Sequence, residues 1–261
     1  MFIRNRVLSP TAFLIALAVR SSRFLVATIA AAVIFSTPLA ASLTSSGVNS
    51  QNTVTFAQFL DIGGTNSFVM TNNGTSDTFT GSTQILFGYE NISGYLLPAL
   101  QGYETATLTI SATTTTTGSI NNGNVQESGF SGSFSIIAST PVMGMSNLLS
   151  GTFQSLATFT GGNGANSATF SDSTPNSTEV IFTSSFISFV NPQTEAFGLS
   201  FSSVNPDFQL AVNNFIANFT AAGTGTFSSN PPPISDIPEP SSIFSMGLGL
   251  FALAVCAIAR R

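Results

Sequence analysis

Between Arg23 and Arg260 the chain contains no lysine, arginine or histidine, and its one cysteine is Cys256. A domain built from this stretch has no side-chain salt bridge, no disulfide and no His or Cys metal site to stabilise it. It must rely on burial of apolar side chains and on backbone hydrogen bonds. The same absence excludes nucleic-acid binding, because Lys and Arg supply most of the affinity for phosphates. It also excludes a Ser-His-Asp or Cys-His catalytic group, a P-loop and a Schiff-base lysine.

Acidic residues are the only charged groups in the central part of the chain. Ten of them and no basic residue lie between Ser42 and Asp236, so the formal net charge of this segment is −10. Carboxylates, hydroxyls, amides and three tyrosines are therefore the groups available for chemistry or recognition there.

Short runs of β-favouring residues, separated by Gly, Asn, Ser and Pro turns, fill residues 52–230. Residues 106–112 alternate apolar and hydroxyl side chains, which is typical of a half-buried antiparallel strand. The segment 208–219 is ambiguous, because its apolar residues also have helical spacing, but Asn213 and Asn214 favour a strand. Strands are predicted at residues 53–60, 66–71, 84–89, 105–115, 130–138, 148–159, 179–190, 196–204, 209–219 and 223–228.

About ten strands around a phenylalanine-rich interior predict an all-β fold, an antiparallel two-sheet β-sandwich of the jelly-roll-like kind. The predicted domain, residues 42–230, is long enough to bury a sizeable core. Its recurring Thr-Phe-Thr-Gly phrases have no fixed period, so a solenoid is not expected.

The N-terminal segment, residues 1–41, is predicted to be a signal peptide. Arg4 and Arg6 open it, residues 24–35 form an apolar run too short to span a bilayer, and small residues around Ala41 suit a signal peptidase. Cleavage is expected after Ala41 or Ser42. A retained N-terminal membrane anchor is the alternative.

The C-terminal segment has three parts in a fixed order. Residues 231–242 are a proline-rich linker that ends with Pro238, Glu239 and Pro240. Residues 243–261 are an apolar run closed by Arg260 and Arg261, which predicts a transmembrane helix with its arginines held in the cytoplasm.

This arrangement resembles the PEP-CTERM sorting signal of bacterial exported proteins. The resemblance implies a precursor that is anchored in the inner membrane, processed by an exosortase (a membrane protease-transpeptidase) and then found at the cell surface or outside the cell. It also implies an exopolysaccharide system in the host. The same tail can carry an ice-binding protein C-terminal label, which does not transfer that activity to the domain. An ordinary C-terminal anchor, which needs no Pro-Glu-Pro, is the alternative.

Two kinds of site could be built from carboxylates. Five glutamates could serve as the paired carboxylates of a glycoside hydrolase. They are Glu90, Glu104, Glu127, Glu179 and Glu195. Their spacing singles out no pair, and we expect no enzyme activity. Loops around Asp61 and Asp77 are weak candidates for calcium, although Asn and Asp beside Gly also occur in plain turns. No cofactor is predicted.

Two features could contact a glycan. Tyr89, Tyr95 and Tyr103 lie within fifteen residues and could stack on sugars, or they could be half-buried tyrosines at a strand end. A row of threonines could bind sugar or ordered water if neighbouring strands carried matching rows, which are not evident from the sequence; it comprises Thr105, Thr107, Thr109, Thr113, Thr115 and Thr117. Threonine is otherwise a common choice on the wet face of a strand.

Three functions follow, in order of preference. The first is a non-enzymatic cell-surface or extracellular-matrix protein, associated with exopolysaccharide or biofilm and sorted through its tail. The second is a carbohydrate-binding or adhesive module. The third is a glycoside hydrolase that uses carboxylates alone.

Overall fold

The computed structural model describes residues 53–173 and 180–236. The predicted signal peptide, the Pro-Glu-Pro motif, the predicted transmembrane helix and Glu179 lie outside these ranges. Most of the described residues are in β-strands, and their one helical element is the short 3-10 turn η1 (Pro98–Leu100). Within these ranges no helix is long and apolar enough to cross a membrane.

Thirteen strands follow one another along the described chain. They are β1 (Val54–Asp61), β2 (Phe68–Asn72), β3 (Asp77–Tyr89), β4 (Tyr103–Thr114), β5 (Ser119–Asn121), β6 (Asn124–Val142), β7 (Met145–Gly162), β8 (Ala168–Ser173), β9 (Val180–Thr183), β10 (Ile187–Ser188), β11 (Thr194–Asn205), β12 (Phe219–Asn230) and β13 (Ile234–Ser235).

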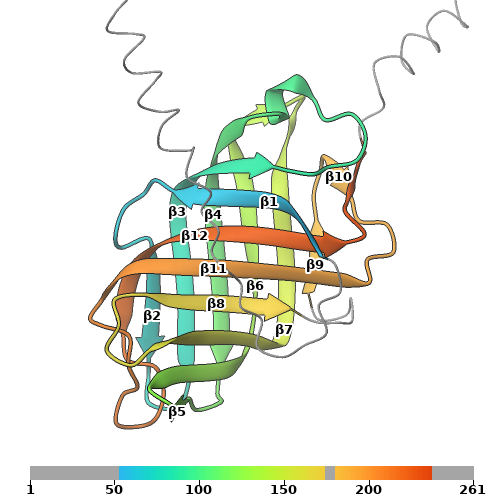
Figure 1. Ribbon diagram of the computed structural model, residues 1–261. Coiled ribbons are helices and arrows are strands. Elements are labelled where there is room, and N and C mark those ends of the chain that lie inside the picture. Colours follow the sequence, from blue (N-terminus) through green and yellow to red (C-terminus); the bar gives the residue numbers. More distant parts are fainter. Residues whose placement is uncertain (1–52, 174–179, 237–261) are drawn as a thin grey trace, which may run out of the picture. The chain divides into compact units, whose positions relative to one another are not determined.

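The main sheet closes on itself. Its strands pair in the order β6-β4-β3-β1-β12-β11-β8-β7, and β7 pairs in turn with β6. Every one of these pairings is antiparallel. Figure 1 shows β1, β12, β11 and β8 crossing one side of the molecule, with β3, β4, β6 and β7 behind them. The result is an eight-stranded barrel.

The all-β prediction is confirmed, but the structure is a closed barrel where the sequence predicted a two-sheet sandwich. The difference comes from β6 and β7, which pair over most of their length. Their register shifts at several points, between Glu127 and Phe130 and again beyond Ile136. Such bulges bend a strand and increase its twist, which allows the sheet to curve and close into a barrel.

Phenylalanine rings fill the barrel interior. Eleven of the twelve largest fully buried side chains are phenylalanines. Phe159 lies among them, with ring centroids 4.4 Å from Phe170 and 5.0 Å from Phe79. Such contacts add to the energy of apolar burial. Phenylalanine rings therefore make up most of the core of the barrel.

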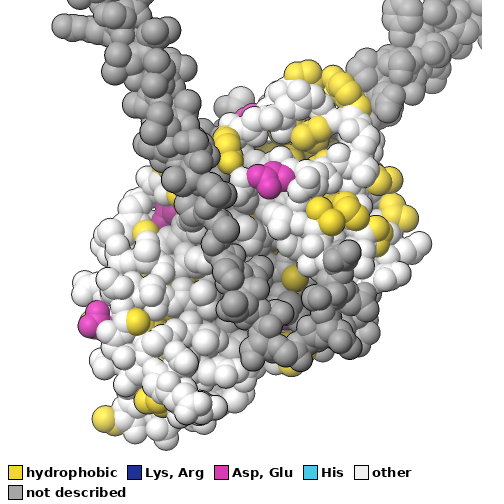
Figure 2. Space-filling view, in the orientation of Figure 1, with side chains coloured by type: hydrophobic (Ala, Val, Ile, Leu, Met, Phe, Trp, Pro, Cys, Tyr) yellow, Lys and Arg dark blue, Asp and Glu magenta, His cyan; other side chains and the backbone are white. Residues whose placement is uncertain are grey.

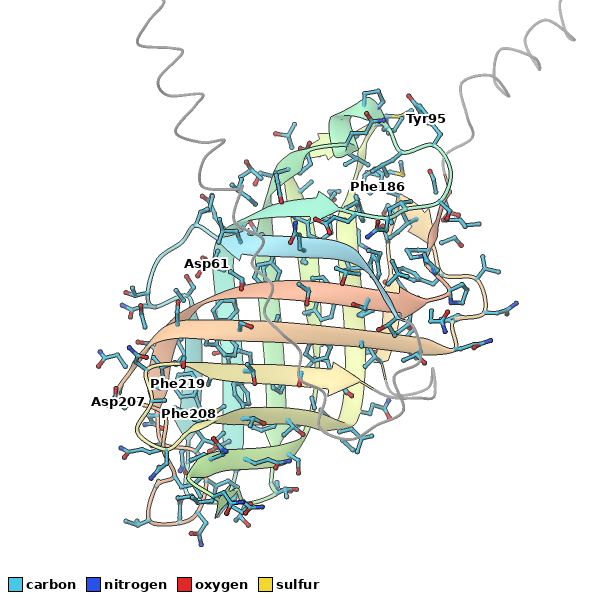
Figure 3. The ribbon with its side chains drawn as sticks, viewed as in Figure 1. Asp61, Tyr95, Phe186, Asp207, Phe208 and Phe219 are labelled. Carbon is cyan, nitrogen blue, oxygen red and sulfur yellow. The ribbon has the colours of Figure 1, made fainter. Side chains whose placement is uncertain are left out.

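One predicted strand, residues 209–219, is wrong: residues 206–218 form a loop, and β12 begins only at Phe219. Asn214 has a positive φ of 64°, and the Ala211 N–H donates to the Phe215 carbonyl at 2.8 Å, so the chain reverses there. Phe208 and Ile216 are nevertheless fully buried. This segment, called here the cap loop, covers the lower end of the barrel in Figure 3, where Phe208 is labelled.

Candidate functional site

The outer face of β3, β4, β6, β7 and β9 carries an ordered set of hydroxyl side chains, called here the hydroxyl face. Side chains alternate along each strand, so the residues between these hydroxyl residues point into the core. Strand register aligns the hydroxyl residues in three rows: Ser82, Thr109, Ser135, Ser150 and Thr183; Thr80, Ser111, Ser133 and Thr152; and Thr78, Thr113 and Ser131.

Few of these hydroxyl groups form hydrogen bonds within the described part of the protein. Thr109 Oγ1 and Ser135 Oγ lie 2.7 Å apart, and Ser150 Oγ donates to Asn147 Oδ1 at 2.7 Å. Ser131 Oγ accepts the Ser155 N–H at 2.9 Å. The other hydroxyls of the set make no hydrogen bond to the described part of the chain. The face therefore offers donors and acceptors in a grid, with about 4.8 Å between strands and about 6.7 Å between rows.

This face extends the threonine row expected from the sequence. Thr105, Thr107, Thr109 and Thr113 are exposed on β4, whereas Thr115 and Thr117 follow the end of that strand. The matching rows, which are not evident from the sequence, are present on β3, β6 and β7. Their signal in the sequence is the alternation of Ser or Thr with Phe or Gly in 78–82 and 131–135.

The three tyrosines do not form one patch. Tyr89 is largely buried, and its hydroxyl contacts the Leu148 carbonyl and Ser184 Oγ; burial raises its pKa far above the ordinary value, and the hydrogen bond with Ser184 partly offsets this. Tyr103 is 43% exposed, and Gln58 Nε2 donates to its hydroxyl at 2.9 Å and to Glu90 Oε1. Tyr95 is partly exposed in the loop before η1, at the upper end of the view in Figure 3.

Two carboxyl groups from distant parts of the sequence meet near the cap loop. Asp77 begins β3 and Glu127 lies on β6, and both are almost completely buried. Burial raises the pKa of Glu127 to about 9, with further contributions from the charge of Asp77 and a hydrogen bond to it. Burial raises the pKa of Asp77 to about 6, partly offset by the hydrogen bond with Glu127. Glu127 therefore holds a proton at neutral pH, and its Oε2 accepts the Ile216 N–H at 2.8 Å.

A third carboxyl group is enclosed elsewhere in the barrel. Glu195 on β11 is 1% exposed, and its Oε2 accepts the Phe182 N–H at 3.2 Å. Burial raises its pKa to about 7, and the hydrogen bond from Phe182 partly offsets this. Of the glutamates considered for catalysis, Glu127 and Glu195 are thus closed off from solvent.

The two calcium candidates lie apart. Asp61 ends β1 opposite Ile85, and Asp77 lies eight positions earlier on β3, about 26 Å away along the strand. Asp61 Oδ1 accepts the Gly63 N–H and the Thr83 hydroxyl, both at 2.7 Å. In the described ranges no group of three or more His, Cys, Asp or Glu residues is arranged to hold a metal ion.

The described chain continues in contact with the barrel past residue 230, where the sequence placed the domain boundary. β13 pairs with β10, and Pro233 is buried. The Ser93 N–H donates to the Pro233 carbonyl at 3.3 Å, and the Ser235 N–H donates to the Ser93 carbonyl at 2.9 Å. The Asp236 N–H donates to the Phe186 carbonyl at 3.1 Å. The segment 233–236, called here the C-terminal clamp, thus ties the chain to the barrel two residues before Pro238.

Comparison with known proteins identifies the tail. Residues 236–261 match the family model of the PEP-CTERM protein-sorting motif. Searches of curated proteins and of solved structures give no match. The matched residues contain Pro238, Glu239, Pro240, Arg260 and Arg261, so the resemblance seen in the sequence is confirmed. The chain therefore carries a PEP-CTERM protein-sorting motif directly after its folded barrel.

Proposed function

We propose that this chain is exported, that an exosortase removes its tail, and that the barrel then serves as a non-enzymatic component of the cell surface or extracellular matrix. The observation that carries the proposal is the sorting motif, which begins where the C-terminal clamp ends. The enclosed carboxyl groups of Glu127 and Glu195 support a non-enzymatic role, because a catalytic acid must reach its substrate.

The test replaces Pro238, Glu239 and Pro240 with Ala, Gln and Ala. This change keeps the apolar run and both arginines, so insertion of the tail should be unaffected. In a native host we expect wild-type protein at the surface or in the medium without its last ~20 residues, a length set by a bilayer-spanning helix. The variant should accumulate at full length in the inner membrane. Mass spectrometry of both fractions measures the outcome.

A matched control changes Ser241 and Ser242 to alanine, beside the motif but outside it. This control should be processed like the wild type. Equal processing of the Pro-Glu-Pro variant would contradict the sorting proposal and leave an ordinary membrane anchor.

A second candidate function, glycan binding, is favoured by the hydroxyl face. Each hydroxyl exchanges a bond with water for a bond with the ligand, so its net contribution is small and many must act together. The extended, uncharged grid therefore suits an extended, neutral, hydroxyl-rich polysaccharide better than a short sugar.

This candidate is tested by co-sedimentation with insoluble neutral polysaccharides. The triple variant Thr109→Val, Thr113→Val and Thr152→Val removes three hydroxyls from the face and keeps β-branched side chains. We expect affinity to fall about tenfold or more. A control with Thr224→Val and Thr226→Val on β12, outside the hydroxyl face, should bind like the wild type. Equal binding by all three proteins would eliminate the hydroxyl face as the glycan site.

A further inference from the structure

The C-terminal clamp limits how far the barrel can move from a membrane that holds the tail. Asp236 is the last described residue hydrogen-bonded to the barrel, and only six residues separate it from Ile243, where the apolar run begins. Fully extended, seven steps along the chain span at most about 25 Å. A domain of this size has a radius of gyration of about 16 Å, so its diameter exceeds the tether. The clamped end must therefore stay close to the bilayer.

That end of the barrel exposes apolar side chains. Ile234 on β13 is 44% exposed and Val190, just after β10, is 51% exposed. Ile234 forms bridges with Ser188 and with Ser93, which brings the loop carrying the partly exposed Tyr95, Leu96 and Leu97 to the same place. Figure 2 shows hydrophobic atoms gathered in the upper right part of the face in view, and Figure 3 places Tyr95 and Phe186 in that region.

We propose that the clamped end, with Tyr95, Val190 and Ile234, lies against the lipid surface of the membrane for as long as the tail is uncut. This inference rests on the proposed function. Apolar side chains and tyrosine favour the bilayer interface. A few such groups bind weakly alone, but a short tether makes the contact intramolecular, with an effective concentration in the ~mM range. We assign lipid as the surface that these residues contact, because the short tether limits the distance between the clamped end and the bilayer itself.

The experiment places one fluorescent reporter at either end of the barrel. Full-length chain with Cys256→Ser is reconstituted in vesicles of phosphatidylethanolamine and phosphatidylglycerol. Val190→Cys labels the clamped end, and Val212→Cys, fully exposed in the cap loop, labels the opposite end as a matched control. Each carries the same environment-sensitive dye, and a lipid with a spin label on its headgroup acts as quencher. We expect quenching several-fold stronger at position 190 than at 212.

The outcomes separate this inference from the function on which it rests. Resistance to carbonate extraction reports whether the tail is inserted. Inserted chain with equal or no quenching at the two positions would overturn the inference and leave the sorting proposal intact. Quenching at 190 that requires added exosortase would overturn it in favour of a protein partner. Chain that fails to insert would overturn both.

Discussion

At the scale of single residues, the carboxyl groups buried near or in the core decide how stability depends on pH. Asp77, Glu127 and Glu195 have pKa values of about 6, 9 and 7 in the folded chain, above their ordinary values of 3.8, 4.5 and 4.5. The folded state therefore keeps protons that the unfolded state has already lost. The stability that these three groups contribute is fully present below their unfolded pKa values. It is lost as the pH rises through their folded pKa values.

We predict that the free energy of unfolding decreases by several kcal/mol between about pH 5 and pH 9, because Glu127 in particular must give up a proton in the core. Glu127→Gln should flatten this dependence, since its amide oxygen can accept the Ile216 N–H and its NH₂ can donate to Asp77. Thermal unfolding followed by circular dichroism measures both effects.

The matched control is Asp207→Asn, which removes an exposed carboxylate within the cap loop. Its pH profile should follow the wild type. A wild-type melting temperature that rises from pH 5 to pH 9 would contradict the raised pKa values of Asp77, Glu127 and Glu195.

At the scale of elements, side-chain amides hold the cap loop in place. Asn72 Nδ2 donates to the Ile216 carbonyl at 3.2 Å and to Asn213 Oδ1 at 3.0 Å, and Asn72 Oδ1 accepts from Asn213 Nδ2 at 2.9 Å. These bonds tie the loop to β2, while Phe208 and Ile216 anchor it in the core. The loop thus depends on polar contacts as well as on apolar burial.

We predict that Asn72→Ala speeds amide hydrogen exchange at Ile216 and its neighbours and lowers stability by about 1 to 3 kcal/mol, because Asn213 and the Ile216 carbonyl lose their partners. Hydrogen exchange followed by mass spectrometry resolves the loop. Val212→Ala, at the exposed tip of the same loop, should leave exchange unchanged. Unaltered exchange in Asn72→Ala would show that apolar burial alone holds the loop.

The sequence predicted most of the strands but not how they pair to form a closed barrel. The sequence predicted strands at the positions of β4, β7 and β11, and in β4 the signal was alternation, because a half-buried antiparallel strand repeats every two residues. It missed the first half of β3 and all of β8, which are rich in Ser, Thr and Gly. The strand predicted at residues 209–219 is instead a loop with buried apolar residues such as Phe215 and Ile216, because a loop that closes a barrel end must also bury side chains.

At the scale of the whole molecule, barrel closure produces the features that no short sequence window contains. Pairing across β3, β4, β6 and β7 aligns the hydroxyl rows, and the meeting of Asp77 with Glu127 joins residues fifty positions apart. The sorting motif, by contrast, is contiguous, so the sequence alone identified it. A local site can be identified from one segment, whereas a site made by sheet register requires the fold.

The whole-molecule charge leads to the last prediction. No basic residue lies in the described ranges, so their carboxylates repel one another with no opposite charge to offset them. Raising NaCl from about 50 to about 300 mM shortens the screening length from more than 10 Å to less than 8 Å, which weakens this repulsion. At pH 8 we expect the melting temperature to rise by a few degrees. Near pH 4 many exposed carboxylates are neutral and the rise should shrink, whereas an equal rise at both values would indicate a general salt effect on apolar burial. A melting temperature that falls with salt at pH 8 would contradict unbalanced repulsion as a determinant of the stability of this barrel.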